Sequence, residues 1–401
     1  MSDANPWRAL WLRPSSAIDA FSAPPRPLVI AFLAALGGAL GFAGLIPLNA
    51  SAIGASLLAK TALVGALAGL VSLYLEALVV NGLARLFGGA GARRDVRAAS
   101  ALSSLPRLLG FSALLAGFAT GLGESDKDQT AWAALLLVAT IGALWSATLF
   151  VDMLARVQKF GLIRAFFVWI VGAVLLSVGL ALCVRIVLFQ PFDAPSASME
   201  PTILPGDYFF VSKYAYGYSR FSLPFAPPIQ GRLFGVAPGR GDVVVFRKPG
   251  SDVDFVKRII GLPGETIRLS KSRLFINGVE VERTEAAPYR TNSFLGRSVE
   301  APAYIEKLPG GPAHRIIQIE GENGLLGTTG DFVVPPWGYF LLGDNRDNST
   351  DSRVPLEHGG VGAVPFDHLI GRVEMIYYSA TPPQDGAPAQ VRPERMGTAV
   401  E

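Results

Sequence analysis

The chain changes character within FFVWIVGAVLLSVGLALCVRIVLFQPFDAPSASMEPTI, residues 166–203. Its first part is apolar and as long as the roughly 20 residues that a helix needs to cross the hydrocarbon core of a bilayer. Its second part holds two serines, Ser196 and Ser198, with prolines on either side. The prolines keep the backbone out of a helix, and residues two apart share one face of an extended segment. The stretch therefore predicts a membrane anchor followed directly by an ordered, extended segment.

Four more apolar stretches precede the anchor, at residues 28–48, 55–80, 101–122 and 131–152. The 401 residues are 50% hydrophobic and only 17% charged, with a mean hydropathy of +0.39. In lipid a helix satisfies its own backbone hydrogen bonds, so we expect an α-helical transmembrane bundle of about five spans. The alternative is that one stretch is a buried or re-entrant helix. The second and third stretches are the weakest, because they contain Lys60, Glu76, Pro106 and Arg107.

The charges of the loops predict the orientation of this bundle. Basic residues lie before the first stretch and after the second and fourth: Arg8, Arg13, Arg26, Arg85, Arg93, Arg94, Arg97, Arg156, Lys159 and Arg164. Residues 49–54 carry no charge, and 123–130 carry one lysine among three acids. Positively charged loops stay in the cytoplasm. We therefore expect a cytoplasmic N-terminus, and five spans then put everything after about residue 190 on the outer side of the membrane, the periplasm of a bacterium. The pI near 9.0 reflects this topology and not nucleic-acid binding.

After residue 190 the pattern becomes that of a β domain. Short runs rich in Val, Ile, Phe and Tyr alternate with Gly and Pro turns, and period-two alternation of this kind predicts strands. The runs lie at 208–218, 242–250, 254–264, 266–281, 314–321, 339–345 and 370–378. The pair Asn277-Gly278 predicts a tight hairpin. We expect a mainly antiparallel β domain, followed by a flexible tail over residues 379–401.

Three clusters after the anchor carry candidate chemistry. A serine such as Ser198 is a nucleophile only with a base beside it; the alternative for this cluster is a Pro/Ser linker next to the membrane. In DFVKRIIGLPG (254–264), Lys257 and Arg258 point to opposite faces of a strand. A lysine buried among apolar neighbours has a lowered pKa and suits a general base; the alternative is a solvated surface pair.

The third cluster is GDNRDNSTDSR, residues 343–353. Alternating acids and arginines predict an ion-pair network beside a site; a calcium loop and a solvated turn are the alternatives, and the calcium loop lacks the glutamate at position twelve. The single cysteine, Cys183, excludes a disulfide scaffold and a multi-cysteine metal site. The three histidines, at 314, 358 and 368, lie in segments without an evident site, which argues against a Ser-His-Asp triad.

Taken together and in this order, the segments resemble the boxes of type I signal peptidases, also called leader peptidases. The segments are the anchor, PSASMEPT (195–202), RGDVVVF (240–246), VKRIIGLPG (256–264) and GDNRDNSTDSR (343–353). The resemblance covers roughly residues 186–376. That family cleaves signal peptides from exported preproteins after small residues at −3 and −1, with a serine–lysine dyad. The resemblance implies a β catalytic domain of the signal peptidase type, no cofactor and no metal. Its partners would be signal peptides and membrane lipid, with the export machinery a further candidate and no nucleic acid.

The resemblance also implies a role for each matching residue. Ser198 would be the nucleophile and Lys257 the general base, and Ser196 with the Ser198 amide would form the oxyanion hole. Ser349 would orient the lysine. The residues implied to support this site are Asp351, Arg353, Asp344 and Arg258, with Pro201 and Met199 holding the nucleophile's turn. The residues implied to line the shallow pockets that admit small side chains are Phe192, Ala194, Pro195, Met199, Ile203, Phe255 and Val256.

The front of the chain departs from this family, whose well-studied members have one or two spans. Its opening, NPWRALWLRP (5–14), resembles the Yip-type multi-spanning membrane domain. We therefore predict four parts: 1–160, a Yip-like membrane domain of four spans; 161–190, a fifth span that anchors the next part; 191–378, a periplasmic catalytic domain; and 379–401, the tail. The chain would lie in the bacterial inner membrane. Two alternatives stay open, a maturation peptidase with a narrow substrate in a secretion or conjugation system, and a membrane scaffold with a dormant peptidase domain.

Overall fold

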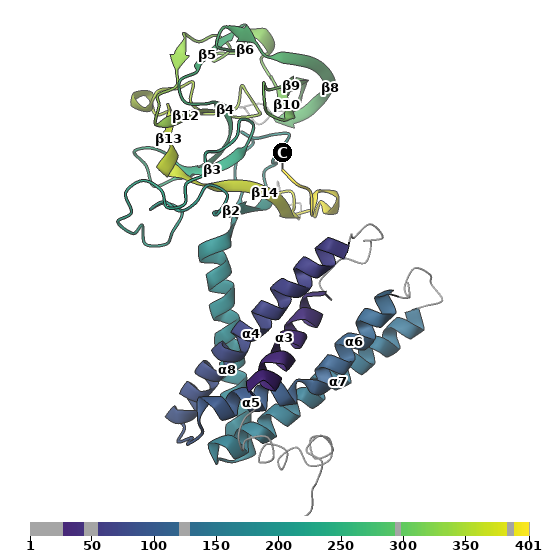
Figure 1. The fold of residues 1–401 in the computed structure, drawn as a ribbon. Coiled ribbons are helices and arrows are strands. Elements are labelled where there is room, and N and C mark those ends of the chain that lie inside the picture. The colour runs from purple at the N-terminus through teal and green to yellow at the C-terminus, as the bar shows by residue number, and fades with distance from the viewer. Residues whose placement is uncertain (1–26, 44–54, 120–128, 293–297, 383–388, 401) are drawn as a thin grey trace, which may run out of the picture. The chain divides into compact units, whose positions relative to one another are not determined.

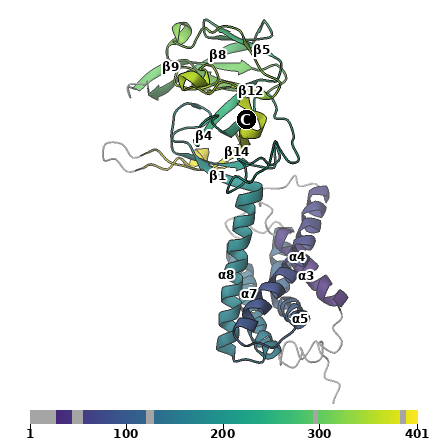
Figure 2. The ribbon, with the colours of Figure 1, turned by 90° about the vertical axis from the view of Figure 1, so that its left-hand side faces the viewer.

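The computed structural model describes residues 27–43, 55–119, 129–292, 298–382 and 389–400. The chain divides into two compact units, Met1–Leu180 and Ala181–Glu401. The first unit is helical and the second is built of strands (Figures 1 and 2). Some of the predicted features lie outside the described residues: Arg8, Arg13, Arg26, the NPWRALWLRP segment, the loop at 49–54 and most of 123–130.

The described part of the first unit consists of helices α3 (Pro27–Ala43), α4 (Ala55–Leu86), α5 (Arg93–Ser103), α6 (Leu105–Ala119), α7 (Gln129–Gln158) and α8 (Leu162–Cys183). A π-helical turn, Val184–Leu188, extends the last of them. Among the described residues, three helical segments are long and apolar enough to span a membrane: Lys60–Leu86, Thr130–Gln158 and Leu162–Leu188. Pro27–Leu40 is a shorter apolar helix. The structure thus confirms the predicted helical region, in which the described residues give three candidate spans and one shorter apolar helix.

The third apolar stretch differs from the expected single span over 101–122. The chain is helical on both sides of Ser104, with α5 ending at Ser103 and α6 beginning at Leu105. Pro106 explains the break, because proline is tolerated in the first turn of a helix but cannot continue one from before. The second stretch, which looked equally weak because of Lys60 and Glu76, is a continuous helix over Ala55–Leu86.

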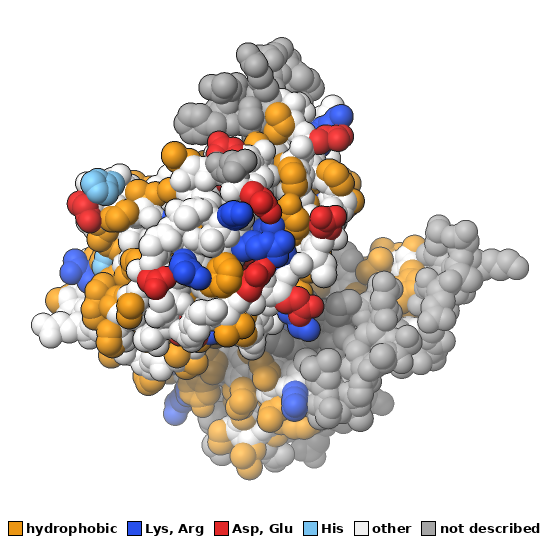
Figure 3. Space-filling model, turned by 90° about the horizontal axis from the view of Figure 1, so that it is seen from above, with side chains coloured by type: hydrophobic (Ala, Val, Ile, Leu, Met, Phe, Trp, Pro, Cys, Tyr) orange, Lys and Arg blue, Asp and Glu red, His pale blue; other side chains and the backbone are white. Residues whose placement is uncertain are grey.

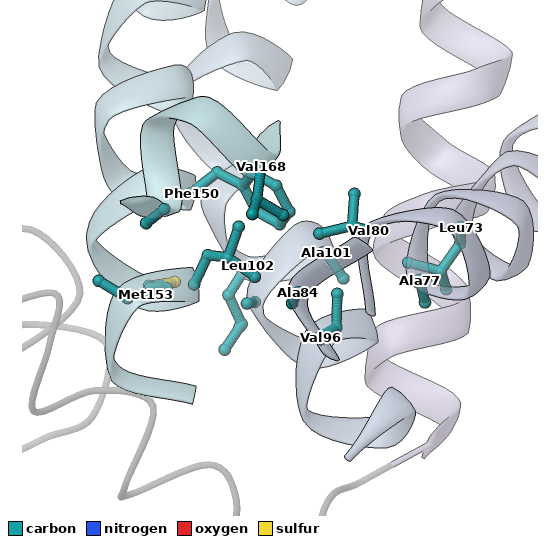
Figure 4. Packing of buried hydrophobic residues seen from close by; sticks show 14 of the residues in the cluster. Leu73, Ala77, Val80, Ala84, Val96, Ala101, Leu102, Phe150, Met153 and Val168 are labelled. Carbon is teal, nitrogen blue, oxygen red and sulfur yellow. The ribbon is translucent and has the colours of Figure 1, made fainter. Parts of the chain in front are cut away.

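The helices of the first unit pack through small and apolar side chains. A buried cluster joins α4, α5, α7 and α8, with Leu102, Met153 and Val168 among its members (Figure 4). Helices α3 and α4 approach so closely that a Cβ placed on Gly69 would lie 2.1 Å from the carbonyl oxygen of Ala34. This is the close packing that small residues permit between helices in lipid.

The second unit is an antiparallel β domain with one large sheet. The large sheet has the order β1 (Phe189–Asp193), β2 (Asp207–Ser212), β14 (Leu369–Ser379), β3 (Val243–Arg247), β4 (Asp254–Gly261), β12 (Gly338–Leu342), β13 (Val364–Pro365). Its neighbouring strands all pair antiparallel. The structure therefore confirms the antiparallel β domain that follows the helical region.

Two smaller sheets complete the domain on the side away from β2 and β14 (Figures 1 and 2). One has the order β10 (Ala313–Ile317), β9 (Ser298–Lys307), β8 (Glu282–Asn292). The other has the order β11 (Phe332–Val333), β5 (Thr266–Ser270), β6 (Arg273–Ile276), β7 (Val279–Glu280). The predicted hairpin joins β6 to β7: Asn277 and Gly278 both have positive φ, 52° and 80°, as a two-residue hairpin turn of this type requires.

The described part of the predicted flexible tail over 379–401 is attached to the domain, while residues 383–388 and 401 lie outside the described residues. Residues 389–400 form backbone bridges to the domain, between Ala380 and Val391 and between Met375 and Ala399. In Figure 1 this yellow segment lies beside β14. Composition suggested a tail because the segment is rich in Pro, Gly and Ala, but its arginines and backbone groups find partners that are distant in sequence.

Candidate active site

The segment that carries Ser198 is fixed at both of its ends. It leaves β1 at Asp193, and the backbone of Ala194 then bonds to two residues further along: its N–H donates to the Asp207 carbonyl at 2.9 Å, and its carbonyl accepts from Gly206 at 3.0 Å. Between these points the chain forms a loop with Ser198 near its start. The carbonyl of Ser198 accepts a hydrogen bond from the Asn345 amide at 3.2 Å, and the Asn345 side chain donates to the Ala197 carbonyl at 3.1 Å.

Lys257 reaches the serine from strand β4. Its Nζ lies 2.7 Å from Ser198 Oγ and 2.9 Å from the carbonyl oxygen of Val256. Lys257 is only 3% exposed and Ser198 6%, while Arg258, on the opposite face of the strand, is fully buried. The alternative of a solvated Lys-Arg surface pair is therefore wrong.

Burial sets the protonation of this lysine. Removing the ammonium from water lowers the pKa of Lys257 from 10.5 to about 8. The carboxylates of Asp351 and Asp344 oppose this change and the charge of Arg353 reinforces it. The neutral amine is thus far more populated near physiological pH than in an ordinary lysine, and a neutral amine in contact with a hydroxyl can accept its proton.

Buried ion pairs form the wall behind the lysine. Arg258 binds Asp344 with two hydrogen bonds, Nε to Oδ1 at 2.9 Å and Nη2 to Oδ2 at 2.7 Å. Arg353 binds Asp351 in the same two-pronged way, at 2.8 Å for both bonds. These arginines hold the pKa of both carboxyl groups below the usual range even though burial opposes it. The locked network that the third cluster predicts is confirmed, and the solvated-turn alternative for it is wrong.

Gly343 allows this wall to approach the nucleophile closely. A Cβ at this position would lie 2.3 Å from Ser349 Oγ and 2.5 Å from the carbonyl oxygen of Ser198, so any side chain would push the two serines away. Ser349 therefore lies next to the backbone of the nucleophile. Its hydroxyl is buried and lies close enough to the Asp351 carboxylate to help lower the pKa of that group.

Ser196 and the amide of Ser198 point to an anion site beside the nucleophile. Ser196 Oγ lies 3.3 Å from Ser198 Oγ, and Ser196 is exposed. The Ser198 N–H has no acceptor in the part of the chain that the structure describes. A hydroxyl and an unused amide N–H next to a nucleophile are the donors from which an oxyanion hole is built.

Most of the predicted pocket residues share one apolar cluster. Ala194, Met199 and Ile203 are buried in it, and Phe192 and Val256 pack against it. Phe255 instead packs in a separate cluster with Phe246, although its ring centroid lies 5.5 Å from Lys257 Nζ. Pro195 is exposed. The structure thus brings five of these seven residues together, next to the serine.

Two residues that the sequence analysis did not single out hold the site together. Asn345 bonds the nucleophile's backbone from the other side, and Thr202 Oγ1 donates to Asp344 Oδ2 at 2.5 Å. Both stand inside the quoted motifs, but only their three-dimensional contacts reveal what they do. Within the described residues, no group of three or more His, Cys, Asp or Glu side chains is placed to hold a metal ion.

The histidines are placed differently from a catalytic base. His314 is buried, with Nε2 3.6 Å from Glu306 and 3.9 Å from Asp344. Burial and the nearby Arg258 lower the pKa of His314 to about 4. His368 Nδ1 lies 2.9 Å from the Arg247 carbonyl oxygen. The basic group in contact with Ser198 is Lys257.

Comparison with known proteins gives consistent matches for both halves of the chain. Residues 166–378 match the family model of signal peptidase, peptidase S26, and residues 8–184 match the Yip1 domain. Signal peptidase I of Rickettsia typhi is 42% identical over 210 residues, which are 50% of this chain and 76% of that protein. Signal peptidase I of Rickettsia rickettsii is 41% identical over 217 residues, 52% of this chain and 78% of that protein. The crystal structure of a signal peptidase I from Enterococcus faecalis is 28% identical and covers 34% of this chain and 97% of that chain, with a TM-score of 0.20.

The buried pair behind the lysine leads to a prediction for stability. Asp344→Ala leaves the Arg258 guanidinium buried without its partner, and breaking such a pair costs about 3–5 kcal/mol of unfolding free energy. The matched control is Glu280→Ala, which breaks the exposed Arg273–Glu280 pair. Charges of both signs lie side by side on the surface of the domain (Figure 3), and exposed pairs contribute little. Denaturant unfolding of the detergent-solubilised chain should show a large loss for Asp344→Ala only; equal small losses would contradict the account of the wall.

Proposed function

The chain belongs to the signal peptidase family, peptidase S26, and we propose that Ser198 and Lys257 are its catalytic dyad. Its activity is that of signal peptidase I, a membrane-bound serine peptidase. The observation that carries the assignment of the dyad is the 2.7 Å contact between Lys257 Nζ and Ser198 Oγ in a buried setting. An intact contact of this kind argues against a dormant peptidase domain.

The reaction follows from the protonation state of the lysine. The neutral amine of Lys257 takes the proton of the Ser198 hydroxyl as its oxygen attacks the carbonyl carbon of the scissile peptide. The resulting ammonium gives a proton to the leaving amine as the peptide bond breaks, and an acyl-enzyme remains. Water then attacks the ester with Lys257 again as the base, which releases the signal peptide and restores Ser198.

The oxyanion of each tetrahedral intermediate is bound by Ser196 Oγ and the Ser198 amide N–H. Ser349 orients the amine of Lys257; its hydroxyl is buried beside the nucleophile's backbone and near the Asp351 carboxylate. Asp351 with Arg353 and Asp344 with Arg258 keep the wall rigid. Removing one oxyanion donor typically lowers kcat by about 10²–10³-fold. After the two dyad residues, loss of the Ser196 hydroxyl should therefore lower kcat the most.

The substrate lies as an extended strand beside β4. Strand β3 pairs with Asp254–Arg258 on one side of β4, whereas β12 pairs on the other side only at Arg258, Ile259 and Gly261. Residues 254–257 therefore keep one edge open to a peptide in β conformation. We assign the apolar cluster of Ala194, Met199 and Ile203 to the floor beneath the side chains at −1 and −3.

The helical region holds the peptidase in the bacterial inner membrane. We assign residues 1–160 to a Yip-like membrane domain, 161–190 to the anchor and 191–378 to the catalytic domain. Five spans, with α3 and α6 completing the three long helices, place the N-terminus in the cytoplasm and the dyad in the periplasm. Signal peptides are the substrates, membrane lipid surrounds the helices, and the export machinery is a further partner.

Contacts between the two basic loops support this orientation. The loop after α4 and the end of α7 meet: the amides of Ala90 and Gly91 donate to the Gln158 backbone carbonyl at 3.3 Å and to its side-chain oxygen at 3.0 Å. Arg164 donates to the Phe87 carbonyl at 3.3 Å. Both positively charged loops thus share one end of the helical unit, as the positive-inside rule requires, and α8 starts from that end.

Ser198→Ala should abolish cleavage of a preprotein while leaving the fold intact, because it removes only the nucleophilic oxygen. Cleavage is followed with purified full-length enzyme in detergent or vesicles, and Ser251→Ala, a serine in the turn between β3 and β4, serves as the control. Residual cleavage at the wild-type rate would show that another residue is the nucleophile. A wild-type chain that cleaves a single preprotein of many would instead favour a narrow maturation peptidase.

The rate should rise with pH through the pKa of Lys257. Since only the neutral amine accepts a proton, kcat/KM should be low below the pKa of about 8 and level off above it. Steady-state rates from pH 6 to 10 give the profile, and the substrate should lack groups that titrate in this range. A rate that is constant across that interval would contradict the assignment of Lys257 as the base.

The orientation is tested by labelling single cysteines in a Cys183→Ser chain. Asp252→Cys, at a fully exposed position between β3 and β4, should react with a membrane-impermeant thiol reagent applied to the periplasmic side. Lys159→Cys, at an exposed position after α7, should react only after the inner membrane is broken. The reverse result would place the dyad in the cytoplasm.

A further inference from the structure

The segment 389–400 lies beyond the part of the chain that matches the peptidase family, which ends at residue 378. It is nevertheless built into the large sheet. Strand β3 pairs with β14 only over Leu369–Arg372. Beyond Arg372 the C-terminal segment forms hydrogen bonds with β14: Val400 N–H donates to the Glu374 carbonyl at 3.0 Å, and Gly397 N–H donates to the Ile376 carbonyl at 2.8 Å. Val400 also packs against the apolar cluster that contains Ala194, Met199 and Ile203.

Two arginines of this segment bind the loop that follows the nucleophile. Arg395 Nη2 donates to Asp207 Oδ2 at 2.5 Å and to the Thr202 carbonyl at 2.9 Å. Arg392 Nη2 donates to Asp207 Oδ1 at 3.2 Å and to the Pro205 carbonyl at 2.8 Å. The arginines therefore contact three residues of the loop, and both are mostly buried, with side chains 17% and 20% exposed for Arg392 and Arg395.

Asp207 connects the arginines to the catalytic segment. It is fully buried, its side chain accepts from the Leu204 amide at 2.8 Å, and its backbone carbonyl accepts from Ala194 at 2.9 Å. The residue thus closes the loop that starts just before Ser198. A buried carboxylate needs a cation and hydrogen bonds to stay ionised, and within the described ranges its salt-bridge partners are Arg392 and Arg395.

We propose that Arg392 and Arg395 are positioning residues for the peptidase reaction, because through Asp207 and the carbonyls of Thr202 and Pro205 they hold the loop that orients Ser198. The C-terminal segment 389–400 is then part of the catalytic unit of this chain and not an appendage. The proposal rests on the peptidase function and on Ser198 as its nucleophile. Neither arginine touches the reacting atoms; each acts through the loop.

The charges of the two arginines also reach the residues around the nucleophile. Burial raises the pKa of Glu200, two residues after Ser198, and the hydrogen bond with Thr291 and the charges of Arg392 and Arg395 oppose that rise. The same loop is therefore held by hydrogen bonds to its backbone and by the ion pairs of Asp207. A displacement of about 1 Å at a catalytic group can cost about 10²-fold in rate, so a small movement of the loop is enough to be measured.

The test compares full-length variants in detergent with one synthetic preprotein. Arg392→Ala with Arg395→Ala should lower kcat by about 10- to 100-fold with a much smaller change in KM, after the rate is divided by the folded fraction from circular dichroism. Arg395→Lys keeps the charge but cannot hold Asp207 and the Thr202 carbonyl together. Its kcat should therefore lie between that of the wild type and that of the double alanine variant. Arg273→Ala, which removes an exposed arginine of the β5–β7 sheet, is the control and should match the wild type.

The outcomes separate this inference from the peptidase function itself. If the wild type cleaves and the double variant keeps its kcat, or loses activity only in step with its folded fraction, the positioning role is overturned and the function stands. If the double variant does not fold, Arg392→Lys with Arg395→Lys decides, because wild-type kcat in that chain would also overturn the role. If neither the wild type nor Ser198→Ala cleaves the preprotein, the proposed peptidase function is itself contradicted, independently of the role of the two arginines.

Discussion

The site depends on a lysine that the fold keeps out of water. Burial lowers the pKa of Lys257 from 10.5 to about 8, a cost of about 3 kcal/mol while the group is charged. The pKa of Lys257 is lower in the folded chain than in the unfolded chain, so burial of the lysine lowers the free energy of unfolding. This loss is present in full below the folded pKa and disappears as the pH rises towards the unfolded pKa. The fold accepts it because a neutral amine in contact with Ser198 Oγ is what makes the hydroxyl a nucleophile.

The ion pairs around the lysine make this arrangement possible. Asp344 and Asp351 are close enough to raise the pKa of Lys257, and free carboxylates there would keep the lysine charged. Each is instead held by its own arginine with two hydrogen bonds, and the charge of Arg353 opposes the effect of the carboxylates on the lysine. The wall thus serves two purposes, since it fixes the geometry of the nucleophile's segment and protects the neutral state of the base.

The sequence predicted those features that depend on a few adjacent residues. The alternation of Lys257 and Arg258 on a strand, the prolines around Ser198 and the turn at Asn277-Gly278 each follow from a few adjacent residues. The break at Ser104 was not predicted, because hydropathy alone indicates one continuous span across Pro106. The roles of Asn345, Thr202 and the C-terminal arginines were not predictable, because their partners in the site lie 142 to 193 residues away and no local pattern encodes such contacts.

The measurement that tests the account most directly is the titration of the Lys257 side chain itself. Lysine labelled with ¹³C at Cε is followed by NMR across pH 6–11 in the solubilised full chain, and the Lys257→Arg spectrum assigns the signal and separates it from Lys213, whose pKa burial also lowers to about 8. The account predicts a midpoint near 8 for Lys257. A midpoint near the ordinary lysine value of 10.5 would contradict it, because the amine would then be charged at every pH at which the enzyme works.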